Sequence, residues 1–337
     1  MSILLSDLDN MAIGATLLGS GGGGDPRYDL LLAKQFIGEY GPVLLLAPDQ
    51  LQREDFVVPC AFIGPPLVST ELVCSGDEFS FLLKEVEKMY GKKPTALVSA
   101  EIGGSNGLVG IWAAAKAGLP LVDGDLIGRA FPQLEMNSTT LFDVPLSYSF
   151  IADGNGNIAS CKVASPYILE QIFRSVCQEF GSNSAVCCFL LDGTTAKKCL
   201  IGGSISRAIN LGKALSQHSE ALNYVGSGCV TSICQKIEGG FLRGSIVIAG
   251  ERQFCIEFQN EFLALFEMRG EEKIPLVLTP DIIALVEEET GAPLSVEGVR
   301  FGMKVKIAKI EAPAIWKSPE GLALVGPKVF GYKEIMI

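Results

Sequence analysis

The stretch TALVSAEIGGSNGLVGIWAAAKAGLPLVDGD, residues 95–125, carries the strongest folding signal in the chain. Residues 95–100 predict a buried strand, residues 107–117 a helix that Gly118 ends, and residues 119–122 a second strand. Consecutive strands that are joined by a helix pair in parallel. The stretch therefore predicts the parallel part of an α/β sheet, with residues 101–106 as the loop after its first strand.

The residues on either side of this stretch predict two different architectures. Apolar residues recur at helical spacing over residues 6–18, and a second helix begins at Pro26. From about residue 221 onward, short apolar runs alternate with glycine and proline turns, which is typical of a barrel or sandwich. We therefore expect a three-layer α/β domain with a partly parallel sheet over residues 1–220, and a β-rich, barrel-like domain over residues 221–337. Two further short runs, residues 198–201 and 322–325, also predict strands.

Composition limits the class of partner. The 337 residues have a net charge of −11 and contain no Lys- or Arg-rich run, which argues against nucleic acids and anionic membranes as partners. The longest apolar stretch, residues 108–122, is interrupted by Lys116, and the amino terminus carries Asp7 and Asp9 where a signal peptide would be basic. The ten cysteines form no Cys-x-x-Cys pair. We expect a cytoplasmic protein that acts on a small molecule and binds neither nucleic acid nor membrane, and the sequence leaves a homo-oligomer open.

Histidine chemistry is restricted by composition as well. The chain has a single histidine, His218, in a polar segment after a helical run. A zinc site rich in histidine is therefore excluded, and a Ser-His-Asp triad would have to use His218. We interpret His218 as a solvated loop residue.

Acidic residues follow both strands of the central unit. Glu101 follows the first strand, and Asp123 and Asp125 follow the second. Ligands of open parallel sheets bind beyond the carboxyl ends of the strands, where these carboxylates could act as general acid or base, or hold a divalent metal ion. Alternatively, either aspartate could cap a helix or form a turn. Arg129 could bind a substrate carboxylate or pair with Asp125.

A run of glycines joins the first two predicted helices. The run comprises Gly21, Gly22, Gly23 and Gly24 and is followed by Asp25. Backbone N–H groups of such a loop, in front of a helix, form a site for a negatively charged group. No Gly-Lys-Ser/Thr follows, so the run is not a Walker loop, and the alternative is a flexible linker. Asn260-Glu261 could reach the same region from the second domain.

Five motifs together resemble one bacterial family, which is named after S-methyl-thiohydantoin desulfurase. The motifs are the glycine loop with its Asp-Pro (Gly19–Pro26), Glu-Ile-Gly-Gly-x-Asn (Glu101–Asn106), Asp-Gly-Asp-x-x-Gly-Arg-Ala-Phe-Pro (Asp123–Pro132), Gln-Asn-Glu (Gln259–Glu261) and Gly-Pro-x-x-Phe-Gly-Tyr (Gly326–Tyr332). The resemblance spans essentially the whole chain. Ser20 and Ser105 depart from it, since relatives often have Thr and Ala there.

The resemblance implies an α/β domain followed by a β-rich domain, and an activity that removes sulfur from a thiohydantoin or its S-methyl form. We accordingly expect a hydrolase that acts on a five-membered cyclic amide or thioamide. Glu101, Asp123, Asp125 and Arg129 are the candidate catalytic residues; the candidate substrate-binding residues are the glycine loop with Asp25, together with Gly103, Gly104 and Asn106. The alternatives are a non-catalytic binding or accessory protein of hydantoin metabolism, and a nucleotide-binding protein that uses the glycine loop.

Overall fold

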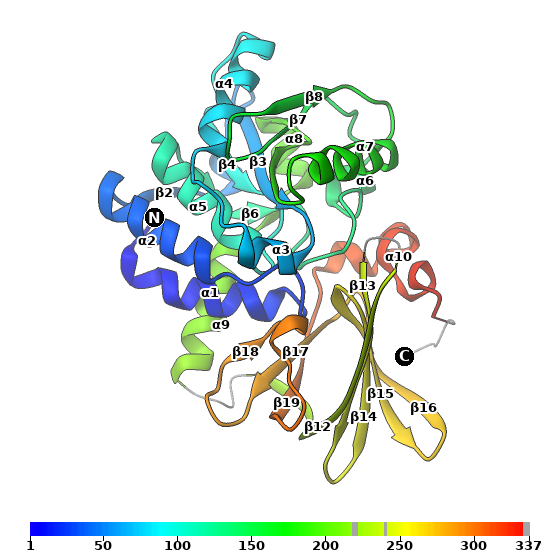
Figure 1. The fold of residues 1–337 in the computed structure, drawn as a ribbon. Helices are drawn as coiled ribbons and strands as arrows, with labels where there is room; N and C mark the ends of the chain where they lie inside the picture. Colours follow the sequence, from blue (N-terminus) through cyan, green and yellow to red (C-terminus); the bar gives the residue numbers. More distant parts are fainter. Residues whose placement is uncertain (218–221, 239–240, 333–337) are drawn as a thin grey trace.

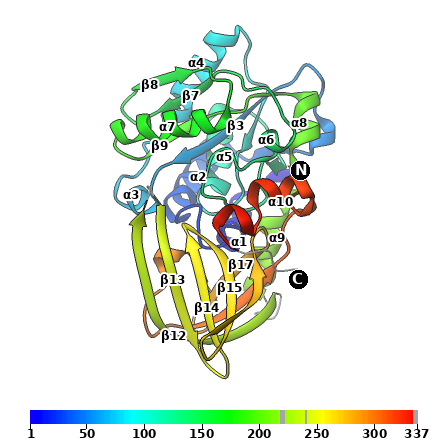
Figure 2. The same cartoon turned by 90° about the vertical axis from the view of Figure 1, so that its right-hand side faces the viewer.

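The chain folds into an α/β part and an antiparallel sheet. In Figures 1 and 2 the α/β part lies above the antiparallel sheet. The computed structural model describes residues 1–217, 222–238 and 241–332. The α/β part ends with a helix at Gln217, and the antiparallel sheet begins at Asn223. The expected domain boundary, between residues 220 and 221, falls outside the described residues.

The α/β part is built on a mixed sheet with the strand order β1-β2-β5-β4-β3-β9-β7-β8, and β10 pairs with β3. Neighbours from β2 to β3 run parallel, and the remaining pairs are antiparallel. The predicted parallel pair is confirmed, because Leu97 lies opposite Leu121 in parallel register. The strands are β1 (Ser2–Ile3), β2 (Val43–Leu46), β3 (Phe56–Ile63), β4 (Ala96–Ser99), β5 (Leu121–Val122), β6 (Gly124–Asp125), β7 (Ser149–Ala152), β8 (Ile158–Cys161), β9 (Ser184–Cys187), β10 (Leu191–Asp192) and β11 (Ile201–Gly202).

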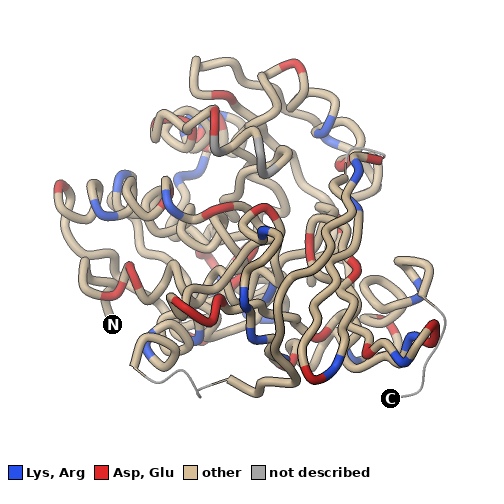
Figure 3. The backbone as a smooth tube through the Cα atoms, turned by 60° about the horizontal axis from the view of Figure 1, so that its bottom comes forward, with Lys and Arg blue, Asp and Glu red and all other residues tan. Residues whose placement is uncertain are grey.

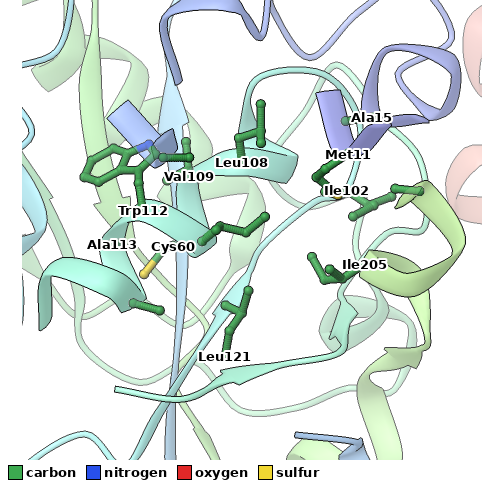
Figure 4. Close-up of a cluster of buried hydrophobic side chains, with 14 of the residues drawn as sticks. Met11, Ala15, Cys60, Ile102, Leu108, Val109, Trp112, Ala113, Leu121 and Ile205 are labelled. Carbon is green, nitrogen blue, oxygen red and sulfur yellow. The ribbon is translucent and has the colours of Figure 1, made fainter. Parts of the chain in front are cut away.

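Helices cover both faces of this sheet, which confirms the three-layer arrangement. Successive strand residues point to opposite faces, so that Val58 belongs to one buried cluster and Val57 to the other. In the first cluster, Leu108 and Trp112 of α5 join Met11 of α1 (Figure 4). The helices are α1 (Leu8–Leu18), α2 (Arg27–Tyr40), α3 (Pro66–Glu71), α4 (Glu78–Tyr90), α5 (Asn106–Ala117), α6 (Ser138–Leu141), α7 (Pro166–Glu179), α8 (Gly193–Cys199) and α9 (Ser204–Gln217), with short 3-10 turns η1 (Leu5–Asp7) and η2 (Pro48–Gln50).

The carboxy-terminal part is a curled antiparallel sheet, and the expected barrel is not closed. Its strand order is β16-β15-β14-β13-β12-β19-β17-β18, and among the described residues no ladder joins the two edges. Register shifts at Tyr224/Gly226 and Val230/Ser232 bend β12, and such bulges increase the local twist. The elements are β12 (Asn223–Glu238), β13 (Phe241–Ala249), β14 (Gln253–Gln259), β15 (Glu261–Arg269), β16 (Glu272–Leu278), β17 (Ile282–Glu287), β18 (Pro293–Leu294), β19 (Lys304–Ile310), η3 (Val296–Gly298), η4 (Ala314–Lys317), α10 (Pro319–Val325) and η5 (Pro327–Phe330).

Two predicted strands are wrong. Most of residues 198–201 falls in or beside α8, which begins where Asp192 accepts a hydrogen bond from the Thr195 N–H at 2.7 Å. Residues 322–325 belong to α10, which begins where Ser318 accepts one from the Gly321 N–H at 3.0 Å. Residues 322–325 thus lie on a capped helix, and residues 198–199 end one, while Ile201 begins the short strand β11; in both helices a side-chain acceptor satisfies an N–H group of the first turn.

The two parts are joined at the end of α1. The Ser20 hydroxyl lies within hydrogen-bond distance of the carbonyl oxygens of Phe262 (3.0 Å) and Ile283 (3.2 Å) and can donate to either, and the Phe262 N–H donates to the Ser20 carbonyl at 2.6 Å. The Val296 N–H donates to the carbonyl of Gly21 at 2.8 Å. The start of the glycine loop is therefore hydrogen-bonded to three segments of the carboxy-terminal part.

Acidic and basic residues are interspersed along the backbone of both parts of the molecule, as Figure 3 shows. Within the described residues, no helix combines the length and the apolar character needed to cross a lipid bilayer.

Candidate active site

A cavity lies at the carboxyl ends of β3 and β4, where the turn between β14 and β15 meets the α/β part. Its volume is about 160 Å³, and a protein cavity of about 150 Å³ accommodates one benzene-sized ring. The site therefore fits a single small ring. Among the residues that line it are Gly23, Gly24, Phe62, Ser69, Glu101, Ser105, Asn106, Phe131, Gln133, Asn137, Glu170, Arg174, Asn183, Cys188, Phe189, Asn260 and Glu261.

Glu101 lies on the cavity wall directly after β4, and part of its side chain remains accessible. The Asn106 side chain holds it in place: its Nδ2 donates to Glu101 Oε1 at 2.6 Å and to the Phe62 carbonyl at 3.1 Å. Burial raises the pKa of Glu101 to about 8, and the charge of Asp125 adds to this effect, while the hydrogen bond from Asn106 opposes it. Glu101 thus has a pKa suited to proton transfer near neutral pH.

Glu261 reaches the same cavity from the first position of β15. Its side chain is buried, and its Oε2 has no hydrogen-bond partner among the described residues. Burial and the nearby charge of Glu101 raise the pKa of Glu261 well above its usual range, and Arg129 acts in the opposite direction. Two carboxyl groups from different parts of the fold thus line the same cavity.

Arg129 lies behind this pair and does not line the cavity. Its guanidinium donates to the carbonyl oxygens of Pro280 (2.6 Å) and Asp281 (2.9 Å), and its Nε donates to that of Ala130 (3.0 Å). Burial lowers the pKa of Arg129 to about 10, so the group remains charged at neutral pH. The expected contact with a substrate carboxylate is not available in this geometry, because the guanidinium is committed to backbone carbonyls of the other part of the fold.

The glycine loop contributes only its last two residues to the cavity wall, Gly23 and Gly24. Their carbonyls accept hydrogen bonds from the Ser105 N–H at 2.8 and 3.3 Å, whereas among the described residues no acceptor pairs with their own N–H groups. The other two glycines allow close packing: a Cβ on Gly21 would lie 2.5 Å from the Phe262 ring, and one on Gly22 would lie 2.2 Å from Glu261 Oε1. The loop therefore supports Glu261 and offers two amides to the cavity.

The two predicted aspartates do not line the cavity. Asp123 receives hydrogen bonds from the N–H and the hydroxyl of Ser206, at 3.0 and 2.6 Å, in the first turn of α9. Asp125 is buried and accepts the N–H groups of Ile102 (2.9 Å), Ile127 (3.1 Å) and Gly128 (2.6 Å). Burial raises the pKa of Asp125 to about 7, and these backbone hydrogen bonds oppose that rise.

Three other predicted residues also lie outside the cavity wall. Asp25 forms a surface ion pair with Arg27. Gly103 and Gly104 pack against Ala130 and Gly23, respectively, where a Cβ atom would clash with backbone. His218 lies outside the described residues.

Sequence reasoning missed the cation of the site. Arg174, on α7, lines the cavity beside Glu170, with which it forms an ion pair, and its guanidinium lies 5.0 Å from the centre of the Phe241 ring. Glu170 also accepts the Leu134 N–H at 3.3 Å. Helical periodicity places Glu170 and Arg174 on one face, four residues apart, but no local signal directs that face toward residues of β4 and β15.

A metal ligand set is not evident at this site. Among the described residues, no group of three or more His, Cys, Asp or Glu side chains is arranged to hold a metal ion. Of the cavity carboxylates, Glu170 is paired with Arg174, and Glu101 and Glu261 remain as two carboxyl groups. A divalent ion, which the sequence left open, would find only these two carboxyl groups as ligands here, and they do not make a ligand set.

Comparison with known proteins assigns nearly the whole chain to one family. Residues 6–162 match the domain described as "S-Me-THD-like, N-terminal domain", and residues 164–337 match "S-Me-THD-like, C-terminal domain". A crystal structure of a protein from Chromobacterium violaceum is similar, with a TM-score of 0.81, 24% sequence identity and coverage of 98% of each chain, which shows a shared fold. No curated protein matches the chain.

Proposed function

The chain belongs to the S-Me-THD-like family, the family of S-methyl-thiohydantoin desulfurase, and from this premise we propose that it hydrolyses the carbon–sulfur bond of a thiohydantoin-type ring bound in the cavity. The proposal rests chiefly on one observation. Glu101 and Glu261 enter the same ring-sized cavity from two parts of the fold, and the pKa of each is raised. Paired carboxyl groups with raised pKa values are a recurrent arrangement for acid–base catalysis.

We assign the base to Glu101 and the acid to Glu261. Burial raises both pKa values, but Asn106 and the more accessible position of Glu101 favour its ionised form, whereas Glu261 is fully buried. Arg129 supplies a positive charge near both groups, which supports a state in which the pair holds one proton. That state contains an acceptor and a donor at the same time.

The reaction then proceeds in two halves. The Glu101 carboxylate removes a proton from water as the water oxygen bonds to the ring carbon that bears sulfur, and Glu261 protonates the adjacent ring nitrogen, or the sulfur of an unmethylated substrate. In the second half, the carbon–sulfur bond breaks, Glu101 gives its proton to the leaving sulfur, and Glu261 takes the hydroxyl proton as the ring carbonyl forms. The products are a hydantoin and methanethiol, or hydrogen sulfide from an unmethylated substrate, and both carboxyl groups return to their starting state.

The remaining polar groups of the cavity support binding. The N–H groups of Gly23 and Gly24 are suited to stabilise negative charge that develops on the substrate, because they need no reorganisation. Phe62, Phe131 and Phe189 supply nonpolar walls for a flat ring.

The test is hydrolysis of S-methyl-thiohydantoin in water labelled with heavy oxygen. We expect the thiol to be released and the label to appear in the hydantoin carbonyl. Turnover should rise as the pH approaches about 8, because the Glu101 base must lose its proton. Glu101→Gln and Glu261→Gln should each lower turnover about 100-fold or more, since removing a general acid or base costs roughly 100- to 10,000-fold.

Asp123→Asn is the matched control. It neutralises a carboxylate that caps α9 outside the cavity, and asparagine is an equally good cap, so turnover should remain. Loss of turnover in Asp123→Asn together with full turnover in both glutamate variants would contradict the proposal. Ring binding without thiol release by the native protein would instead identify the protein as a non-catalytic binding protein.

A further inference from the structure

Another buried carboxyl group, that of Asp29, contacts a residue of the cavity wall from outside the cavity. Asp29, on α2, is buried and forms hydrogen bonds with two side chains of the α5 region. Its Oδ1 accepts the Trp112 indole N–H at 2.8 Å, and its Oδ2 accepts the hydroxyl of Ser105 in a short hydrogen bond. Ser105 itself lines the cavity. The acid–base steps proposed for Glu101 and Glu261 use neither Asp29 nor Ser105.

We propose that Ser105, oriented by Asp29, accepts a hydrogen bond from a ring N–H of the substrate and so selects rings that carry no substituent on that nitrogen. The inference rests on the proposed function, since it concerns the ring bound in the same cavity. Ser105 is thus a specificity-determining residue, and Asp29 is a positioning residue that does not contact the ring.

The direction of the Ser105 hydroxyl determines whether it donates or accepts a hydrogen bond in the cavity. A serine hydroxyl has one proton and two acceptor lone pairs. Ser105 is the N-cap of α5, yet its side chain makes no capping hydrogen bond and donates to Asp29 instead. Since the one proton is committed to Asp29, the side of the oxygen that faces the cavity can only accept. A ring N–H satisfies that acceptor, whereas an N-methyl group cannot and would be crowded against it.

The surroundings of Asp29 keep it an acceptor at neutral pH. Burial raises the pKa of Asp29 to about 6, and the hydrogen bonds from Ser105 and Trp112 oppose that rise. Glu78, at the start of α4, adds a small increase in the pKa of Asp29, and the Cys74 thiol, whose own pKa burial raises, also interacts with Asp29. Below about pH 6, a protonated Asp29 can donate to Ser105, and the hydroxyl proton is then free to turn into the cavity.

The experiment compares the affinity of thiohydantoin with the affinities of its two mono-N-methyl derivatives, by calorimetric titration. Native protein should bind thiohydantoin about 5-fold more tightly than one of the two derivatives, since a hydrogen bond contributes about 1 kcal/mol, which is about 5-fold in affinity. Ser105→Ala should weaken thiohydantoin binding by about 3- to 10-fold and largely abolish the discrimination. Ser216→Ala, the same change on the exposed face of α9, should leave the affinity for thiohydantoin and the discrimination unchanged.

Asp29→Asn provides a second measurement. The asparagine oxygen can still accept from Trp112, which directs the amide N–H group toward Ser105, so the discrimination should fall without any change in Ser105 itself. In the native protein, the discrimination should also fall as the pH is lowered below about 6. Ratios of affinities are compared because titration of Glu101 and Glu261 affects all three probes alike.

The outcomes separate this inference from the proposed function. If Ser105→Ala loses affinity equally for all three probes, or loses none, the inference is contradicted and the proposed function stays in place. Native protein that binds none of the probes contradicts both. Discrimination that disappears in Ser105→Ala and is retained in Ser216→Ala supports the inference even if Asp29→Asn fails to fold.

Discussion

Single carboxyl groups set the chemistry of this protein through their burial. Burial raises the pKa values of Glu101, Asp125 and Asp29 to about 8, 7 and 6, and it raises the pKa of Glu261 well above its usual range. In each case loss of water is the main cause, because a charged carboxylate loses more solvation on burial than a neutral carboxyl. The same environment that keeps a proton on Glu261 makes the ionised form of Glu101 costly for the folded state.

This cost predicts how stability depends on pH. The folded-state pKa of Glu101 lies above its ordinary value of 4.5, so the folded protein binds more protons than the unfolded chain between about pH 4.5 and 8. The free energy of unfolding should therefore decrease as the pH rises across that window, by up to about 1.4 kcal/mol per pH unit for each such group. Urea denaturation at several pH values measures the slope.

Glu101→Gln should make that slope shallower, since it removes one of the groups that titrate. Glu179→Gln, on the exposed end of α7, should leave the slope unchanged. A Glu101→Gln variant with the native slope would show that Glu101 titrates in the folded protein as it does in the unfolded chain.

At the scale of elements, the loop after α1 is shaped by the side chain that it must accommodate. Gly22 lies against Glu261, and the residue that follows it, Gly23, has a φ of 76° and abuts Gly103. Gly22→Ala should push Glu261 from its position, lower turnover at least about 10-fold and destabilise the protein by roughly 1–3 kcal/mol, as overpacked sites do. Thermal unfolding and thiol release measure both effects.

The matched substitution is Gly38→Ala. Gly38 lies within α2 with open space around its Cα, so alanine should stabilise the helix by about 0.5–1 kcal/mol and leave turnover unchanged. Native turnover in Gly22→Ala would show that Glu261 does not need the space that glycine leaves.

At the scale of the whole molecule, Arg129 links the two parts of the fold beneath the cavity. It connects the segment after β6 with the carbonyls of Pro280 and Asp281, and it neutralises charge near Glu101 and Glu261. Arg129→Met should destabilise the protein by about 3–5 kcal/mol, because removing a buried cation leaves its partners unsatisfied. Calorimetry should also show less cooperative unfolding of the two parts.

Arg27→Met is the control, because Arg27 forms an exposed ion pair with Asp25, and exposed pairs contribute about 0–1 kcal/mol. Equal stability losses in the two variants would mean that Arg129 does not connect the two parts energetically.

Local physics explains the elements that could be predicted from the sequence. Helix α5 follows from apolar periodicity and ends at Gly118, whose φ of 66° suits glycine. The hairpin of β7 and β8 forms around Asp153, which accepts the N–H groups of Asn155 and Asn157, both at 2.9 Å. The strands predicted over residues 198–201 and 322–325 are wrong because a run of only three or four apolar residues has no distinguishable period.

For the site, the order of the predicted strands and the rule for ligands of parallel sheets were enough to place Glu101 and Asn106 near a sheet edge, whereas the glycine run was predicted only as a loop between two helices. Only the tertiary structure decided which acidic residues share the cavity. Glu261 and Arg174 reach it from β15 and α7, whereas Asp123 turns to cap α9. The reason is physical: spacing along the chain encodes the local hydrogen bonds of a residue, but burial, and with it the pKa of a carboxyl group, depends on segments that meet only when the two parts pack together.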